Sequence, residues 1–126
     1  MTEEASNPWA AIVGRCFTVA SMACTLGMTE AAVVEAGHSL RLLMLYTADD
    51  VLLFPSFELH HGQAVDGLTE ILRILQTGAN APWTWAQWLN TELPGEDPPR
   101  NITLLYEGRL NKAIRNATHD AWAWKS

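Results

Sequence analysis

The fold is decided by residues 18–39, TVASMACTLGMTEAAVVEAGHS, which indicate two short helices around a tight turn. Apolar residues recur at helical spacing through residues 18–26, and the Thr18 hydroxyl can cap the first free N–H groups of a helix. Gly27 follows, and glycine ends a helix at positive φ without steric cost. The stretch therefore predicts a helix that stops sharply at residue 27.

A second helix is predicted directly after this turn. Thr29 offers another hydroxyl cap, the helix is expected from Glu30 to about Ala36, and Gly37 is expected to end it. The spacing between the two helices is that of a helix-turn-helix, in which a small residue, a turn glycine and a branched apolar residue stand at fixed intervals. Ala23, Gly27 and Val33 occupy those three places. A plain pair of antiparallel helices with a glycine turn is the alternative.

Two apolar, strand-like runs follow the helix pair. Residues 40–46 and 51–54 are separated by Thr47-Ala48-Asp49-Asp50, which carries turn-forming residues, and Pro55 lacks the N–H that a strand needs to continue. A hairpin in this position favours the winged form of the helix-turn-helix.

The chemistry of the second helix argues against strong DNA binding. Residues 1–62 hold two cations against seven acids, a net charge of −5, whereas phosphate contacts supply most non-specific DNA affinity. If this unit binds operator DNA, we expect it to bind weakly alone and to act as a homodimer. A role in packing or dimerisation only is the alternative. The candidate DNA-binding residues are Thr29, Glu30, His38, Ser39 and Arg41.

The second half of the chain is predicted to be helical. Helices are expected at residues 65–76, 83–90, 101–106 and 110–122, with Pro82 at the start of the second and Asn101 as a cap of the third. The predicted fold is mainly α: a helix-turn-helix with a short β-hairpin, winged-helix-like, followed by a small helical domain. The boundary is placed between residues 1–62 and 63–126.

Composition narrows the class of protein. The 126 residues are 48% apolar and 17% charged, with a net charge of −6, which supports a folded core and excludes a generally basic nucleic-acid coat. The acidic N-terminus is unlike a signal peptide, and the apolar runs are too short to span a membrane. A cytoplasmic location is expected.

Three motifs in the second half carry a resemblance to a known family. They are Trp88-Leu89, Leu93-Pro94-Gly95-Glu96-Asp97-Pro98 and Leu104-Leu105-Tyr106-Glu107-Gly108. With the preceding helix-turn-helix and strand pair, the chain resembles the Xre/MbcA/ParS antitoxins over roughly residues 18–122. The family usually has Pro-x-x-Gln-Phe after the strand, where this chain has Pro55-Ser56-Phe57-Glu58-Leu59.

The resemblance implies a function and a partner. Such antitoxins neutralise a toxin, typically a RES-domain toxin that consumes NAD, by covering its active site with the C-terminal domain. The N-terminal domain of such proteins can dimerise and repress its own operon. A stand-alone helix-turn-helix transcriptional regulator, bacterial or phage, without a toxin partner is the alternative function.

Residue chemistry points to protein binding independently, because Trp and Arg are enriched at interface hot spots. We expect the two C-terminal tryptophans to lie in an interface rather than in the core. The candidate partner-binding residues are Trp88, Arg109, Lys112, Arg115, Trp122 and Trp124.

Enzyme chemistry finds no support in the sequence. No nucleotide-binding or hydrolase motif is present, and Cys16 and Cys24 are expected to be buried apolar residues rather than nucleophiles. His60 and His61 are expected to point apart on a strand, without further ligands at metal spacing. We therefore predict no enzyme activity, no cofactor and no metal.

Overall fold

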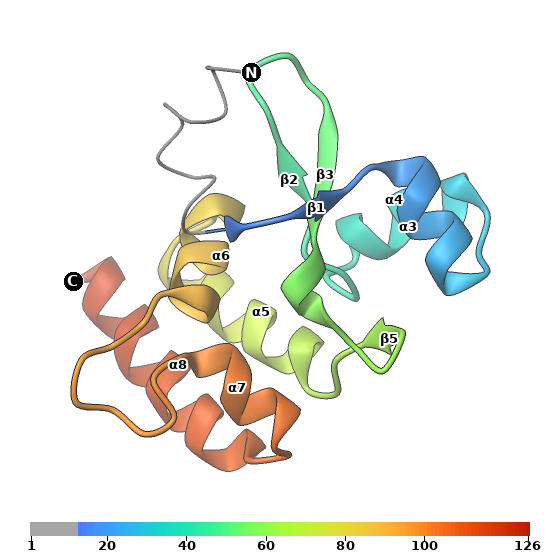
Figure 1. Ribbon diagram of the computed structural model, residues 1–126. Helices are drawn as coiled ribbons and strands as arrows, with labels where there is room; N and C mark the ends of the chain where they lie inside the picture. The colour runs from blue at the N-terminus through green and yellow to red at the C-terminus, as the bar shows by residue number, and fades with distance from the viewer. Residues whose placement is uncertain (1–12) are drawn as a thin grey trace, which may run out of the picture.

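The computed structural model describes residues 13–126 as a mainly helical protein with a small sheet. Two short helices lie to one side, a hairpin projects upward, and four further helices form the rest of the body (Figure 1). The predicted fold class is confirmed: a winged helix-turn-helix is followed by a helical unit.

The two helices of the helix-turn-helix are α3 (Val19–Leu26) and α4 (Glu30–His38). Both begin at the predicted caps: Thr18 and Ser21 form a reciprocal capping box, and the Ala32 N–H donates to Thr29 Oγ1 at 3.0 Å. Gly27 ends α3 with φ at 69°. The prediction that both cysteines are buried is wrong, because Cys24 lies on the exposed side of α3 and Cys16 is only partly buried.

The turn sets the two helices at a steep angle. Their axes bend by 100°, within the range that helix-turn-helix motifs show. Ala23 and Val33 are buried where the helices cross, and they join a small core with Met22 and Phe54. The intervals between Ala23, Gly27 and Val33 thus predict correctly how the two helices cross.

Gly37 does not end α4, contrary to the prediction. The helix continues to His38, with Ser39 as its C-cap. Gly37 is buried because Met44 packs directly on it: a Cβ at this position would lie 2.5 Å from Met44 Sδ. The glycine therefore serves close packing rather than helix termination.

The sheet has three antiparallel strands, in the order β1 (Cys16–Phe17), β3 (Leu52–Pro55), β2 (Leu45–Tyr46). Phe17 pairs with Phe54, and Leu45 pairs with Leu53. The sequence predicts that Pro55 stops the strand after Phe54, but Pro55 is the last residue of β3 and pairs with Cys16. The short strand β1 was not predicted.

The predicted strand at residues 40–46 is much shorter in the structure, where only Leu45–Tyr46 pairs. The N–H groups of residues 41 and 42 instead donate to Ala36 O and close the end of α4. The next N–H, that of Leu43, donates to the Glu58 side chain at 2.7 Å. These donors are therefore already satisfied and do not join the sheet.

A second, smaller hairpin leads to the helical unit. A single 3-10 turn, η1 (Ser56–Glu58), precedes β4 (Leu59–His60), which pairs with β5 (Gln63–Ala64). The prediction that His60 and His61 point apart is wrong. Their ring centroids lie 4.0 Å apart because both turn residues, His61 and Gly62, have positive φ.

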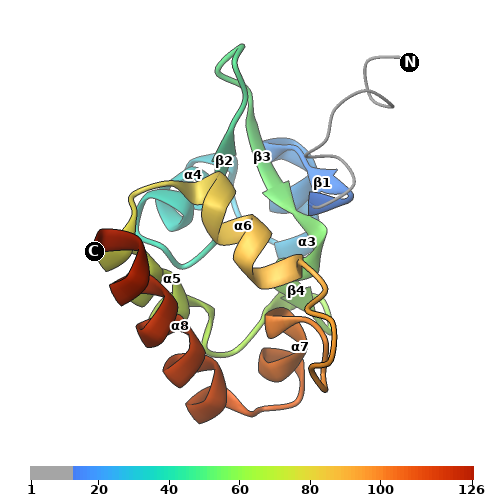
Figure 2. The same cartoon turned by 90° about the vertical axis from the view of Figure 1, so that its left-hand side faces the viewer.

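Four helices complete the chain: α5 (Leu68–Gly78), α6 (Pro82–Asn90), α7 (Asn101–Tyr106) and α8 (Leu110–Lys125). All four were predicted, with α8 longer than expected. Asn101 is the first residue of α7 rather than its cap, which is Arg100. Helices α5 and α8 pack against each other along their length (Figure 2).

Two apolar cores share one segment of chain. Along residues 42–45 the side chains alternate, as in any extended strand. Leu42 and Met44 enter the helix-turn-helix core, while Leu43 and Leu45 enter the core of α5–α8. Because neighbouring residues of this stretch enter different cores, the two cores lie on opposite sides of the same backbone. The division of the chain into two units at residue 62 stays a prediction.

Within residues 13–126 no single helix is long and apolar enough to cross a membrane. Only α3 and α4 taken together pass that test by length and composition, as a pair bent by 100°.

Candidate protein-binding groove

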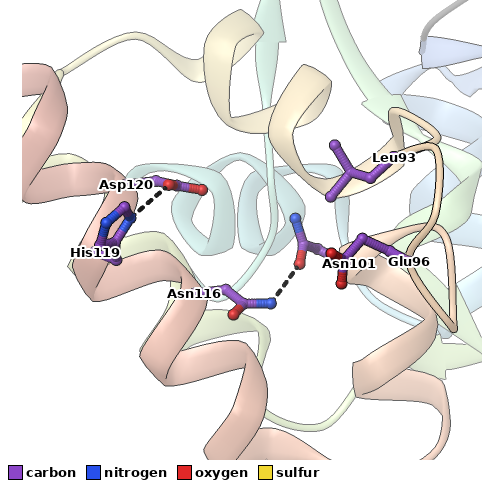
Figure 3. Close-up of a pocket in the computed structure, with 6 residues that line it drawn as sticks. All are labelled: Leu93, Glu96, Asn101, Asn116, His119 and Asp120. Atoms are coloured by element: carbon purple, nitrogen blue, oxygen red, sulfur yellow. Dashed lines mark hydrogen bonds and ion pairs between the residues drawn. The ribbon is translucent and has the colours of Figure 1, made fainter.

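The helical unit carries a groove between α6, the loop at residues 91–100 and α8. Two adjoining open cavities form it, one of about 210 Å³ and one of about 290 Å³. They share Leu93, Asn101 and Asp120, so they are parts of one depression. Figure 3 shows one end, where Leu93 and Asn101 face Asn116 and Asp120 across the opening.

The loop at residues 91–100 is closed on itself and carries an apolar side chain at the rim. The Leu93 N–H donates to Pro99 O at 2.8 Å, and Arg100 forms an ion pair with Glu92 at 2.8 Å. The Arg100 Nε also donates to Asn90 O at 3.1 Å, which ties the loop to the end of α6. Leu93 itself remains 39% exposed and belongs to neither core.

The floor of the groove is a buried polar bridge between three helices. Asn101 is only 5% exposed. Its Nδ2 donates to Trp88 O at 3.2 Å, and its Oδ1 accepts from Asn116 Nδ2 at 3.1 Å. Buried amides are retained where their hydrogen bonds are made, so Asn101 fixes the spacing of α6, α7 and α8.

The opposite wall joins an aromatic ring to a carboxylate. Trp88 Nε1 donates to Asp120 Oδ2 at 2.7 Å, and His119 Nδ1 lies 3.2 Å from Asp120 Oδ1. Trp124 lines the same wall, one helical turn beyond Asp120, and packs against the helical core. Both carboxylate oxygens of Asp120 are engaged, so this residue is held in place.

The groove is lined by both apolar and polar side chains. It offers one exposed leucine, two half-buried tryptophan rings, and amide and carboxylate groups along its length. Indole rings combine a large apolar area with low conformational cost, which suits them to binding surfaces. Within residues 13–126 no group of three or more His, Cys, Asp or Glu side chains is arranged to hold a metal ion.

The structure brings together only two of the six predicted partner-binding residues. Trp88 and Trp124 line the groove. Arg109 lies before α8, 3.4 Å from Glu107, and Lys112 is half-buried. Arg115 and Trp122 are exposed on the outer side of α8 and do not line the groove.

The predicted DNA-binding residues lie on one edge of the helix-turn-helix. Thr29 is the cap of α4, and both Glu30 and His38 are exposed. Ser39 Oγ accepts a hydrogen bond from Arg41 Nε at 2.9 Å, so the one nearby guanidinium is turned toward the end of the helix. The face therefore presents an acid at its start and a single arginine at its end.

The three residues that both cavities share, Leu93, Asn101 and Asp120, were not predicted as functional. Leu93 belongs to one of the family-like motifs, and the sequence predicts Asn101 only as a helix cap. Asp120 lies 32 residues from its partner Trp88, and no periodic pattern in the sequence connects the two.

No protein-family model and no curated protein matches this sequence. Among solved structures, the chain is similar to the NMR structure of Rv2175c, with a TM-score of 0.69 and 20% sequence identity. The similarity covers 85% of this chain and 81% of that one. At this level of identity the two proteins share a fold, and the likeness carries no further conclusion.

Proposed function

We propose that this chain is an antitoxin-like protein that binds a protein partner, a RES-like toxin, through the groove of its helical unit. The observation that carries the proposal is Leu93. It is a large apolar side chain held 39% exposed by a closed loop, beside the rings of Trp88 and Trp124. Tryptophan is among the residues most enriched at binding hot spots, and the exposed leucine extends the apolar area that the two indole rings offer to a partner.

The motifs that resemble the antitoxin family divide between core and groove. Leu89, Leu104 and Leu105 are buried in the helical core, while Trp88 and Leu93 line the groove. Leu93 supports the proposal in particular, because it lies outside both cores and is not needed to hold the helices together. We also place the chain in the cytoplasm, where such a toxin acts, and propose that it works as a homodimer.

Substitution of Leu93 by aspartate tests the groove. We expect the wild-type chain to restore growth to cells that express a RES-domain toxin of its own host, and Leu93→Asp to lose that rescue. A buried charge in an apolar contact costs several kcal/mol, so binding should weaken by about a hundredfold or more. The free variant should keep its stability, since Leu93 lies outside both cores.

Gln76→Asp is the matched control for this experiment. Gln76 is exposed on α5, is absent from the groove, and belongs to neither core. Rescue should survive this change. Rescue by Leu93→Asp at the wild-type level, with the two proteins expressed equally, would contradict the proposal.

DNA binding is the second candidate function, and one observation favours it. Helix α4 is exposed along its outer side, beside a hairpin that stands clear of the body, which is the arrangement that a winged helix-turn-helix presents to a major groove (Figure 1). Glu30 and Glu35 on that side would repel phosphates, so we propose that operator binding is weak for the isolated chain.

Neutralising the two glutamates tests this candidate. Glu30→Gln combined with Glu35→Gln should tighten binding to duplex DNA by about tenfold at low salt, because two repulsions with phosphates are removed. The binding constant should be measured by fluorescence anisotropy across a salt titration. Glu70→Gln combined with Glu107→Gln, two exposed acids of the helical unit, is the control. Equal gains in both double variants would show that α4 does not face the DNA.

A further inference from the structure

The outer side of α8 carries an exposed aromatic residue between two cations. Arg115, Trp122 and Lys125 lie seven and three residues apart, so they fall on one side of the helix. Trp122 is 64% exposed, the most exposed large apolar residue of the described chain. The buried side of α8 is formed instead by Ala113, Ala117 and Ala121.

This outer side has no role in the groove or in the cores. Trp122 packs in neither core, in contrast to Trp124. Arg115 and Lys125 form no ion pair with any residue between 13 and 126. Residues 100–126 hold five cations against two acids, so the α8 outer side lies in a locally positive part of an acidic protein.

The hairpin at residues 45–55, hereafter the wing, carries the opposite charge to the outer side of α8 and has a similar apolar content. Tyr46 is 46% exposed and Val51 is 49% exposed, on the two arms of the hairpin. Asp49 and Asp50 are exposed at its tip and form no ion pair within the described residues. The tip is ordered by Thr47, whose Oγ1 accepts a hydrogen bond from the Val51 N–H at 3.0 Å.

The shape of the hairpin lets it reach another molecule. In both views the wing projects from the body, clear of the helices (Figures 1 and 2). Three of the four exposed large apolar residues in the described chain lie on the wing or on the α8 outer side, and Leu93 is the fourth. Each of these two surfaces offers what the other lacks: an acidic tip with apolar flanks, and a tryptophan with cationic flanks.

We propose that the wing of one copy of this chain docks on the α8 outer side of a second copy. Tyr46 and Val51 cover Trp122, while Asp49 and Asp50 pair with Arg115 and Lys125. Two reciprocal contacts give a closed dimer, and successive single contacts give an open chain of copies. The proposal is independent of the groove and of toxin binding.

Charge complementarity selects a second copy as the occupant. Duplex DNA would be repelled by the two acids of the wing, because its phosphates are also negatively charged. A second copy supplies, on one molecule, both the acids for α8 and the cations for the wing. Because the charges are exposed, the association should be weak and should fall as salt rises.

A charge swap tests the proposal in the full chain. One variant carries Asp49→Lys and Asp50→Lys, and the other carries Arg115→Glu and Lys125→Glu. Sedimentation velocity at about 100 μM and low salt should show association of the wild type and monomers for each variant alone. A mixture of the two variants should associate again, because each reversed wing then meets a reversed α8.

Separate readouts distinguish lost docking from lost folding. Trp122→Ala should reduce association at least tenfold and leave the thermal midpoint unchanged, since Trp122 is outside both cores. A wild-type chain that stays monomeric at low salt would overturn the proposal. So would association that survives in each charge variant alone, or a mixture of the two variants that stays monomeric.

Discussion

Gly78→Ala is expected to destabilise the protein by about 3 kcal/mol, although glycine-to-alanine changes in helices usually stabilise. Gly78 is the last residue of α5, where the helix crosses α8. A Cβ at this position would lie 2.6 Å from Ala121 Cα, and it would also overlap the carbonyl oxygen of the same residue. Backbone atoms cannot rotate away, so α5 and α8 must separate and open the helical core.

Urea denaturation measures this effect as a lower midpoint at an unchanged slope. Gln76→Ala is the matched control, because Gln76 is exposed in the same turn of α5 and should change stability by less than about 0.5 kcal/mol. A Gly78→Ala variant as stable as the wild type would show that the two helices do not approach this closely.

Glu58→Gln is expected to remove a pH dependence of stability that the wild type shows. Glu58 is fully buried, at 0% exposure. Its Oε1 accepts the Leu43 N–H at 2.7 Å, while Oε2 has no hydrogen-bond partner. Burial raises the pKa of this carboxyl well above its ordinary value of 4.5, and the hydrogen bond from Leu43 opposes that shift only in part.

The sign of the effect follows from proton linkage. Between the unfolded pKa and the raised folded pKa, the folded state holds a proton that the unfolded state has lost. The contribution of Glu58 to stability is therefore greatest below about pH 4.5 and falls as the pH rises toward the folded pKa, by up to about 1.4 kcal/mol per pH unit. Glutamine carries no charge at any pH and keeps the acceptor for Leu43, so the variant should lose this slope.

Unfolding free energies at pH 5, 6, 7 and 8 give the difference between wild type and variant directly. We expect the stability of the variant relative to the wild type to increase as the pH rises from 5 toward the folded pKa of Glu58. Glu70→Gln, at an exposed position of α5, should run parallel to the wild type. A Glu58→Gln curve that also runs parallel would show that Glu58 is ionised in the folded protein.

Local features of this fold were predictable because their causes lie close together in the sequence. Thr18, Gly27 and Thr29 cap helices whose ends lie within four residues of them, so their roles follow from residue type and spacing. The four helices of the second half likewise follow from apolar periodicity.

Features that depend on tertiary contacts were not predictable in this way. The strand predicted at residue 40 begins at 45, because Glu58, fifteen residues away, accepts the Leu43 N–H. Gly37 was interpreted as a helix end because its packing partner, Met44, is brought close only by the fold. The groove itself depends on the hydrogen bond between Trp88 and Asp120, which no local sequence pattern predicts.

The two C-terminal tryptophans show most clearly what the sequence does not predict. Trp122 and Trp124 were assigned together to an interface, but they differ by about 200° around a helix. Trp124 therefore packs on the core and lines the groove, while Trp122 is exposed on the outer side of α8. The sequence indicates that tryptophans suit an interface. Only their positions around α8 show that Trp124 lines the groove and that Trp122 faces away from it.

Affinity purification of the tagged chain from its native host, at moderate salt and after nuclease treatment, tests the central claim most directly. The account predicts recovery of a small protein, in roughly equimolar amount, that is retained by Gln76→Asp and lost by Leu93→Asp. Recovery of the chain alone, or of a partner that Leu93→Asp retains fully, would contradict a protein-binding role for the groove.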